Sequence, residues 1–215
     1  PLWWLILNGP ILTFRPSKSG KAYQKIWDKE NYGSPLRKFT INQTSKIKKI
    51  FKNYKNISID YAMRYGTPEI EKTLNKMTEK GCSKILLVPL YPQYAASTSA
   101  TVKDEVFKWM LKQRWQPDLR TIAPWFDDQQ YIKALAETIK KNIINKKNLD
   151  KLVVSFHGIP KRYFMAGDPY HCHCIKTARL LKEELKWPDD KILVTFQSRF
   201  GPEPWLQPYT DETII

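Results

Sequence analysis

Residues 151–160 read Lys-Leu-Val-Val-Ser-Phe-His-Gly-Ile-Pro, an apolar, β-branched run that leads into a histidine and a turn. Such a run is typical of a buried strand. Helical periodicity follows over Thr177 to Leu185, and a second strand-like run covers Lys191 to Thr195. Strands separated by a helix at this spacing predict a parallel sheet with right-handed crossovers.

The same alternation runs back through the middle of the chain. Strands are expected at 57–63, 84–90 and 119–122. Helices are expected at 67–81, from about residue 98, and over a third segment with Ile132, Leu135, Ile139 and Ile143 on its inner face. The Lys-rich stretch from Lys140 to Asp150 is the best candidate for a domain boundary. The pattern predicts an α/β protein whose two halves repeat in structure.

The composition is that of a globular protein. The chain has 215 residues, 42% of them hydrophobic and 27% charged, enough for one large α/β domain or a domain and a half. Three cysteines, an odd number, cannot form a closed disulfide framework, so a secreted disulfide scaffold is excluded and a reducing compartment is expected.

The charge balance is strongly basic, with a formal net charge of +15. This excess fits an anionic partner, but much of it is Lys interleaved with Asn and Ile, which is typical of a solvated surface. The sequence has no Arg runs or aromatic strand motifs of RNA-binding proteins, and no nucleic acid partner is expected.

Membrane insertion is not expected either. No run reaches the roughly 18 apolar residues that span a bilayer. The apolar opening from Leu2 to Phe14 is broken by Asn8, Gly9 and Pro10, and it lacks the features of a signal peptide.

Polar and aromatic residues gather directly after the expected strands, where ligands bind in open α/β sheets. These positions are Arg64-Tyr-Gly-Thr67, Tyr91-Pro-Gln-Tyr-Ala-Ala-Ser-Thr98, His157-Gly-Ile-Pro160 and Phe196-Gln-Ser-Arg-Phe-Gly201.

His157 is the sharpest candidate among them. A neutral imidazole at the edge of a sheet can accept a proton near pH 7 or bind a metal, whereas the alternative is a hydrogen bond to the backbone of its loop. Arg64 and Tyr65 offer a guanidinium fork and an amphipathic ring for a flat acidic ligand, or an ion pair with a local acid. Thr98 is expected to cap a helix, and Trp205 fits a core, a lid or a stacking role equally.

The segment His171-Cys-His-Cys174 looks like a metal site but has the wrong spacing for one. Adjacent residues cannot all converge on one ion, and with Cys82 the chain lacks the four thiolates of an iron–sulfur cluster. A loop and first helical turn with partly exposed side chains is the favoured interpretation.

Taken together, these motifs resemble the ferrochelatase family. The strongest matches are Ser155-Phe-His-Gly-Ile-Pro-Lys-Arg-Tyr163, Gly167-Asp-Pro-Tyr170 and Thr195-Phe-Gln-Ser-Arg-Phe-Gly-Pro-Glu-Pro-Trp-Leu-Gln-Pro-Tyr-Thr-Asp-Glu-Thr213. Supporting matches are Leu90-Tyr-Pro-Gln-Tyr94, Ser97-Thr98, Met63-Arg-Tyr-Gly66 and Gly33-Ser-Pro-Leu36. The resemblance runs along essentially the whole chain.

The resemblance implies a lyase that inserts Fe²⁺ into protoporphyrin IX to form protohaem, the last step of haem biosynthesis. It implies two Rossmann-like, chelatase-like lobes, residues 1–147 and 148–215, with the porphyrin cleft between them. His157 corresponds to the family's active-site histidine, as proton acceptor or as metal ligand. Cleft residues implied by the match are Arg64, Tyr65, Ser34, Tyr94 and Trp205.

Two departures from the family are expected. The family's first strand and glycine-containing loop would precede Pro1, and its catalytic glutamate would lie beyond Ile215, so this chain alone is expected to be inactive. Some members carry a [2Fe–2S] cluster, but Ala96 stands at one of the cysteine positions, which argues against a cluster here.

The resemblance also implies a cytoplasmic protein with peripheral membrane contact through Leu2 to Phe14, and the alternative for this stretch is an ordinary helix packed on the core. Two alternatives stay open: a chelatase of another tetrapyrrole or metal, such as coproporphyrin or cobalt, and a non-catalytic tetrapyrrole-binding protein.

Overall fold

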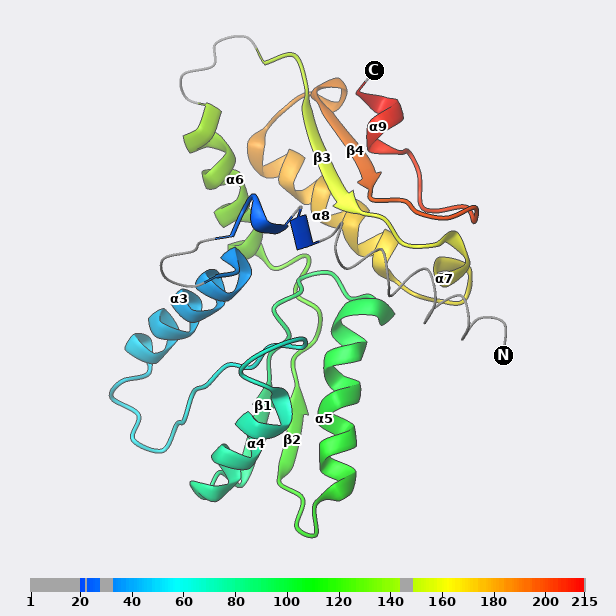
Figure 1. The fold of residues 1–215 in the computed structure, drawn as a ribbon. Helices are drawn as coiled ribbons and strands as arrows, with labels where there is room; N and C mark the ends of the chain where they lie inside the picture. The colour runs from blue at the N-terminus through cyan, green and yellow to red at the C-terminus, as the bar shows by residue number, and fades with distance from the viewer. Residues whose placement is uncertain (1–19, 22, 28–32, 144–148, 215) are drawn as a thin grey trace. The chain divides into compact units, whose positions relative to one another are not determined.

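The computed structural model describes residues 20–21, 23–27, 33–143 and 149–214 (Figure 1). It forms two compact units, Pro1–Cys82 and Ser83–Ile215. The apolar opening from Leu2 to Phe14 and the lobe boundary expected at 147/148 lie outside the described residues. That boundary stays a prediction.

The first unit contains α3 (Pro35–Ile50) and α4 (Ile70–Glu79). Helix α4 confirms the helix expected at 67–81, but it begins later because the Met63 N–H donates to Pro68 O at 2.8 Å and keeps the intervening residues in a loop. Gly81 follows the helix with a φ of +84°, the left-handed conformation that ends helices.

The strand expected at 57–63 is wrong. Only an isolated bridge joins Met63 to Glu69, and no strand in the described part of the first unit lies alongside residues 57–62. A strand needs a neighbour to satisfy its backbone groups, so the β-branched composition does not suffice here.

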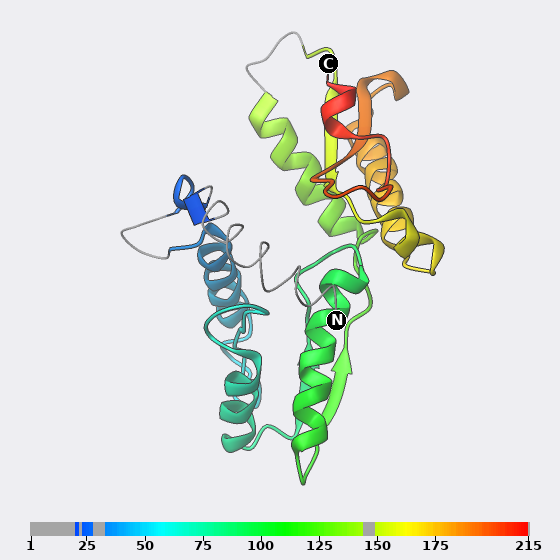
Figure 2. The ribbon, with the colours of Figure 1, turned by 45° about the vertical axis from the view of Figure 1, so that its right-hand side comes forward.

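In the second unit, β1 (Lys84–Leu87) pairs in parallel with β2 (Asp118–Thr121). The π-helix η2 (Ala96–Ala100) and the helix α5 (Thr101–Lys112) connect the two strands. Helix α5 buries Val106 and Trp109 and runs alongside β2 in both views (Figures 1 and 2). Thr98 lies inside η2, so the expectation that it caps a helix is wrong.

The second parallel pair consists of β3 (Leu152–His157) and β4 (Ile192–Gln197). Its register runs from Leu152 opposite Ile192 to His157 opposite Gln197. The connection contains α7 (Lys161–Met165), α8 (Tyr170–Leu185) and the 3₁₀-helix η3 (Asp189–Lys191). The parallel pairing predicted from residues 151–195 is confirmed.

Helix α8 begins at Tyr170, well before Thr177, where its periodicity was expected to start. Asp168 precedes the N-cap residue Pro169, and its Oδ1 accepts the Tyr170 N–H at 3.0 Å, which stabilises the turn that leads into the helix. Helix α6 (Gln129–Ile143) packs on α8, and Ala136, Leu181, Leu185 and Ile192 form one buried cluster.

A second buried cluster lies under the carboxyl ends of β3 and β4. Its members are Ile159, Cys174, Phe196 and Leu206. The short helix α9 (Thr210–Thr213) follows and contacts β4. Within the described ranges, no helix has both the length and the apolar character that crossing a membrane requires.

Candidate active site

His157 is the last residue of β3, and its side chain is exposed at the carboxyl edge of the sheet. Its Nδ1 lies 2.7 Å from Gly158 O. A carbonyl oxygen only accepts, so Nδ1 carries the proton of the neutral ring. The lone pair of Nε2 therefore remains available to a proton or a metal ion.

The turn after His157 is held by main-chain hydrogen bonds on two sides. Gly158 N donates to Gln197 O at 2.8 Å, and two further bonds join the segments 159–161 and 204–206. They run from Lys161 N to Pro204 O at 2.9 Å and from Leu206 N to Ile159 O at 3.0 Å. The backbone next to His157 is thus held in place by hydrogen bonds.

This pairing places Trp205 directly against the turn. A Cβ atom at Gly158 would lie 3.2 Å from Trp205 Cε3 and 3.1 Å from Gln197 O, so only glycine fits there without displacement. The half-buried indole donates its N–H to Phe200 O at 3.0 Å. The structure therefore places Trp205 against Gly158, the residue that follows His157.

A polar row lies beside His157 on the same face of the sheet. Ser155 Oγ is 3.2 Å from Gln197 Oε1 and 2.9 Å from Thr210 Oγ1. Thr210 in turn donates to the buried Thr195 hydroxyl at 2.8 Å. Gln197 belongs to one of the motifs that follow the expected strands, but it is not among the predicted site residues. Its position opposite His157 in the parallel pair places it beside the histidine.

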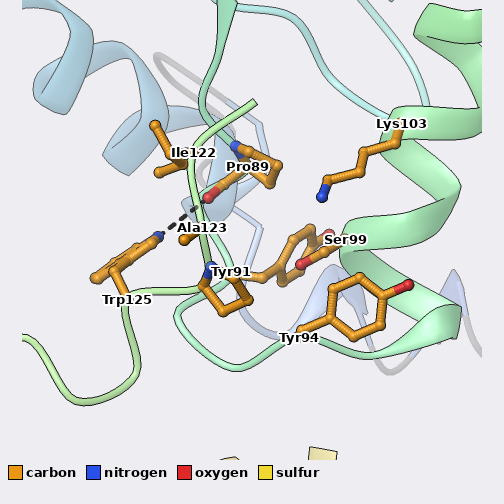
Figure 3. Close-up of a pocket in the computed structure, with 9 residues that line it drawn as sticks. Pro89, Tyr91, Tyr94, Ser99, Lys103, Ile122, Ala123 and Trp125 are labelled. Carbon is orange, nitrogen blue, oxygen red and sulfur yellow. Dashed lines mark hydrogen bonds between the residues drawn. The ribbon is translucent and has the colours of Figure 1, made fainter. Parts of the chain in front are cut away.

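Tyr94 lines an open pocket that follows the ends of β1 and β2 (Figure 3). The pocket is shallow and open, and its walls are Pro89, Tyr91, Tyr94, Ser99, Lys103, Ile122, Ala123, Pro124 and Trp125. Lys103 Nζ lies 5.7 Å from the centre of the Tyr94 ring. The pocket thus combines aromatic walls with one cation.

The segment His171-Cys-His-Cys174 forms the first turn of α8. His171 stacks on Phe196 with ring centres 5.6 Å apart, and His173 stacks on Phe126 at 3.7 Å. Burial raises the pKa of the Cys174 thiol to about 12, so it stays protonated and unreactive at neutral pH. Across the described residues, no three His, Cys, Asp or Glu side chains gather as a metal site would require.

Arg64, Tyr65 and Ser34 belong to the first unit. The Arg64 guanidinium lies 4.5 Å from the centre of the Tyr65 ring, and Tyr65 is 76% exposed at the tip of the loop that the Met63–Pro68 bond closes. Ser34 is half-buried at the N-cap position of α3, without a side-chain capping bond. The predicted site residues thus fall into two groups, each described within its own unit.

The similarity to known proteins extends over essentially the whole chain. The ferrochelatase family model matches residues 1–215. Curated relatives named ferrochelatase include one from Allorhizobium ampelinum, 54% identical over 99% of this chain and 62% of the relative. Another, from Rhizobium meliloti, is 53% identical over 99% of this chain and 63% of the relative.

More distant proteins extend the comparison. A ferrochelatase from Marinobacter nauticus is 47% identical over 100% of this chain and 58% of its own length. Among solved structures, SirB from Bacillus subtilis with Fe³⁺ matches with a TM-score of 0.55 and 19% identity, covering 80% of this chain and 65% of that one. This likeness supports the chelatase-like α/β fold. The chain spans about three fifths of the length of the curated relatives.

Proposed function

The chain belongs to the ferrochelatase family, and from this we propose that the full-length protein inserts Fe²⁺ into protoporphyrin IX to form protohaem. Ferrous iron is a substrate in this reaction. The observation that carries the proposal is the exposed His157 at the carboxyl edge of the β3–β4 pair, with its Nε2 lone pair available.

Metal insertion requires that two pyrrole N–H protons leave as the ion enters the macrocycle. A neutral imidazole can accept such a proton or hold the arriving ion, and both roles use the same Nε2 lone pair. The hydrogen bond from Nδ1 to Gly158 O supports either role because it fixes the ring and its tautomer.

The proposed porphyrin contacts are the residues that match the family's cleft. Arg64 would pair with a propionate through its guanidinium fork, and Tyr65, Tyr94 and Trp205 would contact the rings, with Ser34 as a hydroxyl partner. The exposed Tyr65 ring and the half-buried Trp205 beside Gly158 support these assignments.

The proposal includes no [2Fe–2S] cluster held by this chain alone. Such a cluster needs four thiolates, whereas the chain has three cysteines, and Cys174 is buried among apolar side chains. We also propose that the protein works in the cytoplasm with peripheral contact to the membrane, which the net charge of +15 and the apolar stretch from Leu2 to Phe14 support.

The test is metallation of porphyrin by the full-length protein, followed as loss of free protoporphyrin fluorescence on addition of Fe²⁺ or Zn²⁺. His157→Ala should lower the rate by about 10²- to 10⁴-fold, the usual contribution of a positioned acid or base. His171→Phe, which keeps an aromatic ring on Phe196, should retain the rate.

Porphyrin binding separates the alternatives. If wild type binds porphyrin without metallating it, the protein is a tetrapyrrole carrier. Faster turnover of coproporphyrin or of Co²⁺ would assign it to another branch of chelatases.

A further inference from the structure

The segment Pro89–Ala96, which carries Tyr94 and one wall of the pocket in Figure 3, is held by residues far away in the sequence. Trp125 makes two bonds, from Nε1 to Pro89 O at 3.3 Å and from its N–H to Pro92 O at 3.2 Å. Three further anchors come from α8 and the turn before it: Thr177 to the Gln93 side chain at 3.0 Å, Asp168 to Ala96 N at 2.7 Å and His173 to Tyr94 N at 3.2 Å.

His173 is the anchor whose side chain can gain a proton closest to neutral pH. A backbone N–H only donates, so Nδ1 of His173 must present a lone pair to Tyr94, and the neutral ring carries its proton on Nε2. Phe126 fixes the ring by stacking on it, with the planes 10° apart. A second proton on the ring would turn Nδ1 into a donor facing a donor.

We propose that His173 is a positioning residue whose Nδ1 holds the Tyr94 backbone, and with it the Tyr94 wall of the pocket, and that protonation of its imidazole breaks this one anchor and loosens the backbone at Tyr94. The consequence for porphyrin binding rests on the proposed function, whereas the anchoring itself does not.

The surroundings of His173 set the pH at which its imidazole becomes protonated. Burial is the largest influence and lowers the pKa of His173 below its ordinary value of 6.5. The carboxylates of Asp127 and Asp168 act in the opposite direction, and the Lys176 ammonium, which also lies 5.6 Å from the Phe126 ring, adds to the lowering. The imidazole is therefore neutral at pH 7, with its acceptor in place.

The sign of the pH dependence follows from linkage. The folded protein binds the His173 proton less readily than the unfolded chain does, so the stabilisation is complete above pH 6.5, the ordinary value. It declines as the pH falls from there through the lowered pKa of the folded state.

Two variants of the full-length protein separate the acceptor from the ring. His173→Asn keeps an acceptor oxygen close to the position of Nδ1 but loses the ring. His173→Phe keeps the ring on Phe126 but loses the acceptor. His171→Phe, the same change two residues earlier, is the matched control.

The readout is residue-resolved hydrogen exchange at the Tyr94 amide in the porphyrin-free protein, compared with the Ile122 amide, which bonds Leu87 O in the β1–β2 pair. At pH 7, His173→Phe should speed exchange at Tyr94 about tenfold relative to Ile122, the worth of one neutral hydrogen bond. His173→Asn and His171→Phe should keep the wild-type ratio. Wild type and His171→Phe, which both keep His173, should lose protection at Tyr94 as the pH falls below 6.5, whereas the two His173 variants should not.

Unchanged protection in His173→Phe, or equal loss in His171→Phe, would overturn the proposal. In metallation assays, His173→Phe should raise KM for porphyrin severalfold with little change in kcat, and His173→Asn should restore it. If wild type does not bind porphyrin, the proposed function fails, and hydrogen exchange still decides whether His173 anchors the segment.

Discussion

The turn after β3 and the segment after β1 occupy equivalent places, at the carboxyl end of the first strand of a parallel pair, yet they are held in different ways. Main-chain bonds to Gln197, Pro204 and Leu206 hold the turn that follows His157. The Tyr94 segment has one such bond, from Trp125 N to Pro92 O, and is otherwise held by side chains, among them Asp168, His173 and Thr177.

This difference predicts how each region responds to substitution. A turn held by backbone tolerates side-chain changes except where the backbones approach closely, as at Gly158. A segment held by side chains is sensitive to substitution of each anchoring residue, even though those residues are distant in the sequence. The first arrangement suits a reacting group that must not move, and the second suits a wall that adjusts to a ligand.

The largest effect is expected at an anchor of the Tyr94 segment. Asp168 is 9% exposed, and its two oxygens accept from Ala96 N and Tyr170 N. Asp168→Ala leaves both N–H groups without their acceptor and should lower the free energy of unfolding by about 3 kcal/mol. Urea denaturation measures this loss.

Asp168→Asn keeps at most one well-placed acceptor oxygen, so its free energy of unfolding should lie between those of wild type and Asp168→Ala. If Asp168→Ala costs no more than removal of the exposed carboxylate at Asp118, the Tyr94 segment does not depend on side-chain anchors and the comparison fails.

A smaller effect is expected where the turn after β3 is tightest. Gly158→Val adds a Cβ that would lie 3.1 Å from Gln197 O and two methyl groups beyond it, so the turn must shift. Overpacking of this kind costs about 2 kcal/mol. Because Trp205 lies on the same side, its fluorescence should change as well, while that of Gly158→Ala should change less. A variant with wild-type stability and emission would show that the turn is looser than its backbone bonds indicate.

The smallest of the three effects concerns a single hydroxyl. Thr177 is 1% exposed, and its Oγ1 accepts from Gln93 Nε2 at 3.0 Å. Thr177→Val keeps the shape but removes this acceptor and the O–H that donates to Phe126 O at 2.8 Å, and should cost about 1 kcal/mol in thermal or urea unfolding. Thr177→Ser, which retains the hydroxyl, should cost less, and the reverse order would mean that packing of the methyl group dominates over the bonds of the hydroxyl.

Much of the fold was predictable because it depends on local patterns. The apolar spacing of Ile132, Leu135 and Ile139 predicts α6, and Gly81 marks the end of α4. The run at 57–63 had the composition of a strand, but strand formation depends on a neighbour that composition does not reveal. Gly167-Asp-Pro169 marks the turn that begins α8, although apolar periodicity becomes evident only from Thr177.

The candidate site was predictable to the same extent. His157 follows from its place after an apolar strand, because parallel strands present their carboxyl ends at one edge. The contact of Trp205 with Gly158, and the role of His173 as an anchor, depend on which segments meet in space. The spacing in His171-Cys-His-Cys174 argued against a metal site, but it gave no sign that His173 would bind a backbone amide.

The long-range anchors of the Tyr94 segment also determine when the pocket can exist during synthesis. Ala96, Tyr94 and Gln93 precede their partners on α8 and in the turn before it by 72, 79 and 84 residues. At roughly 5–20 residues per second, the ribosome makes this segment several seconds before it makes Asp168, His173 and Thr177. The nascent chain therefore lacks these anchors of Tyr94 through that interval, and the pocket wall is completed only once α8 has emerged.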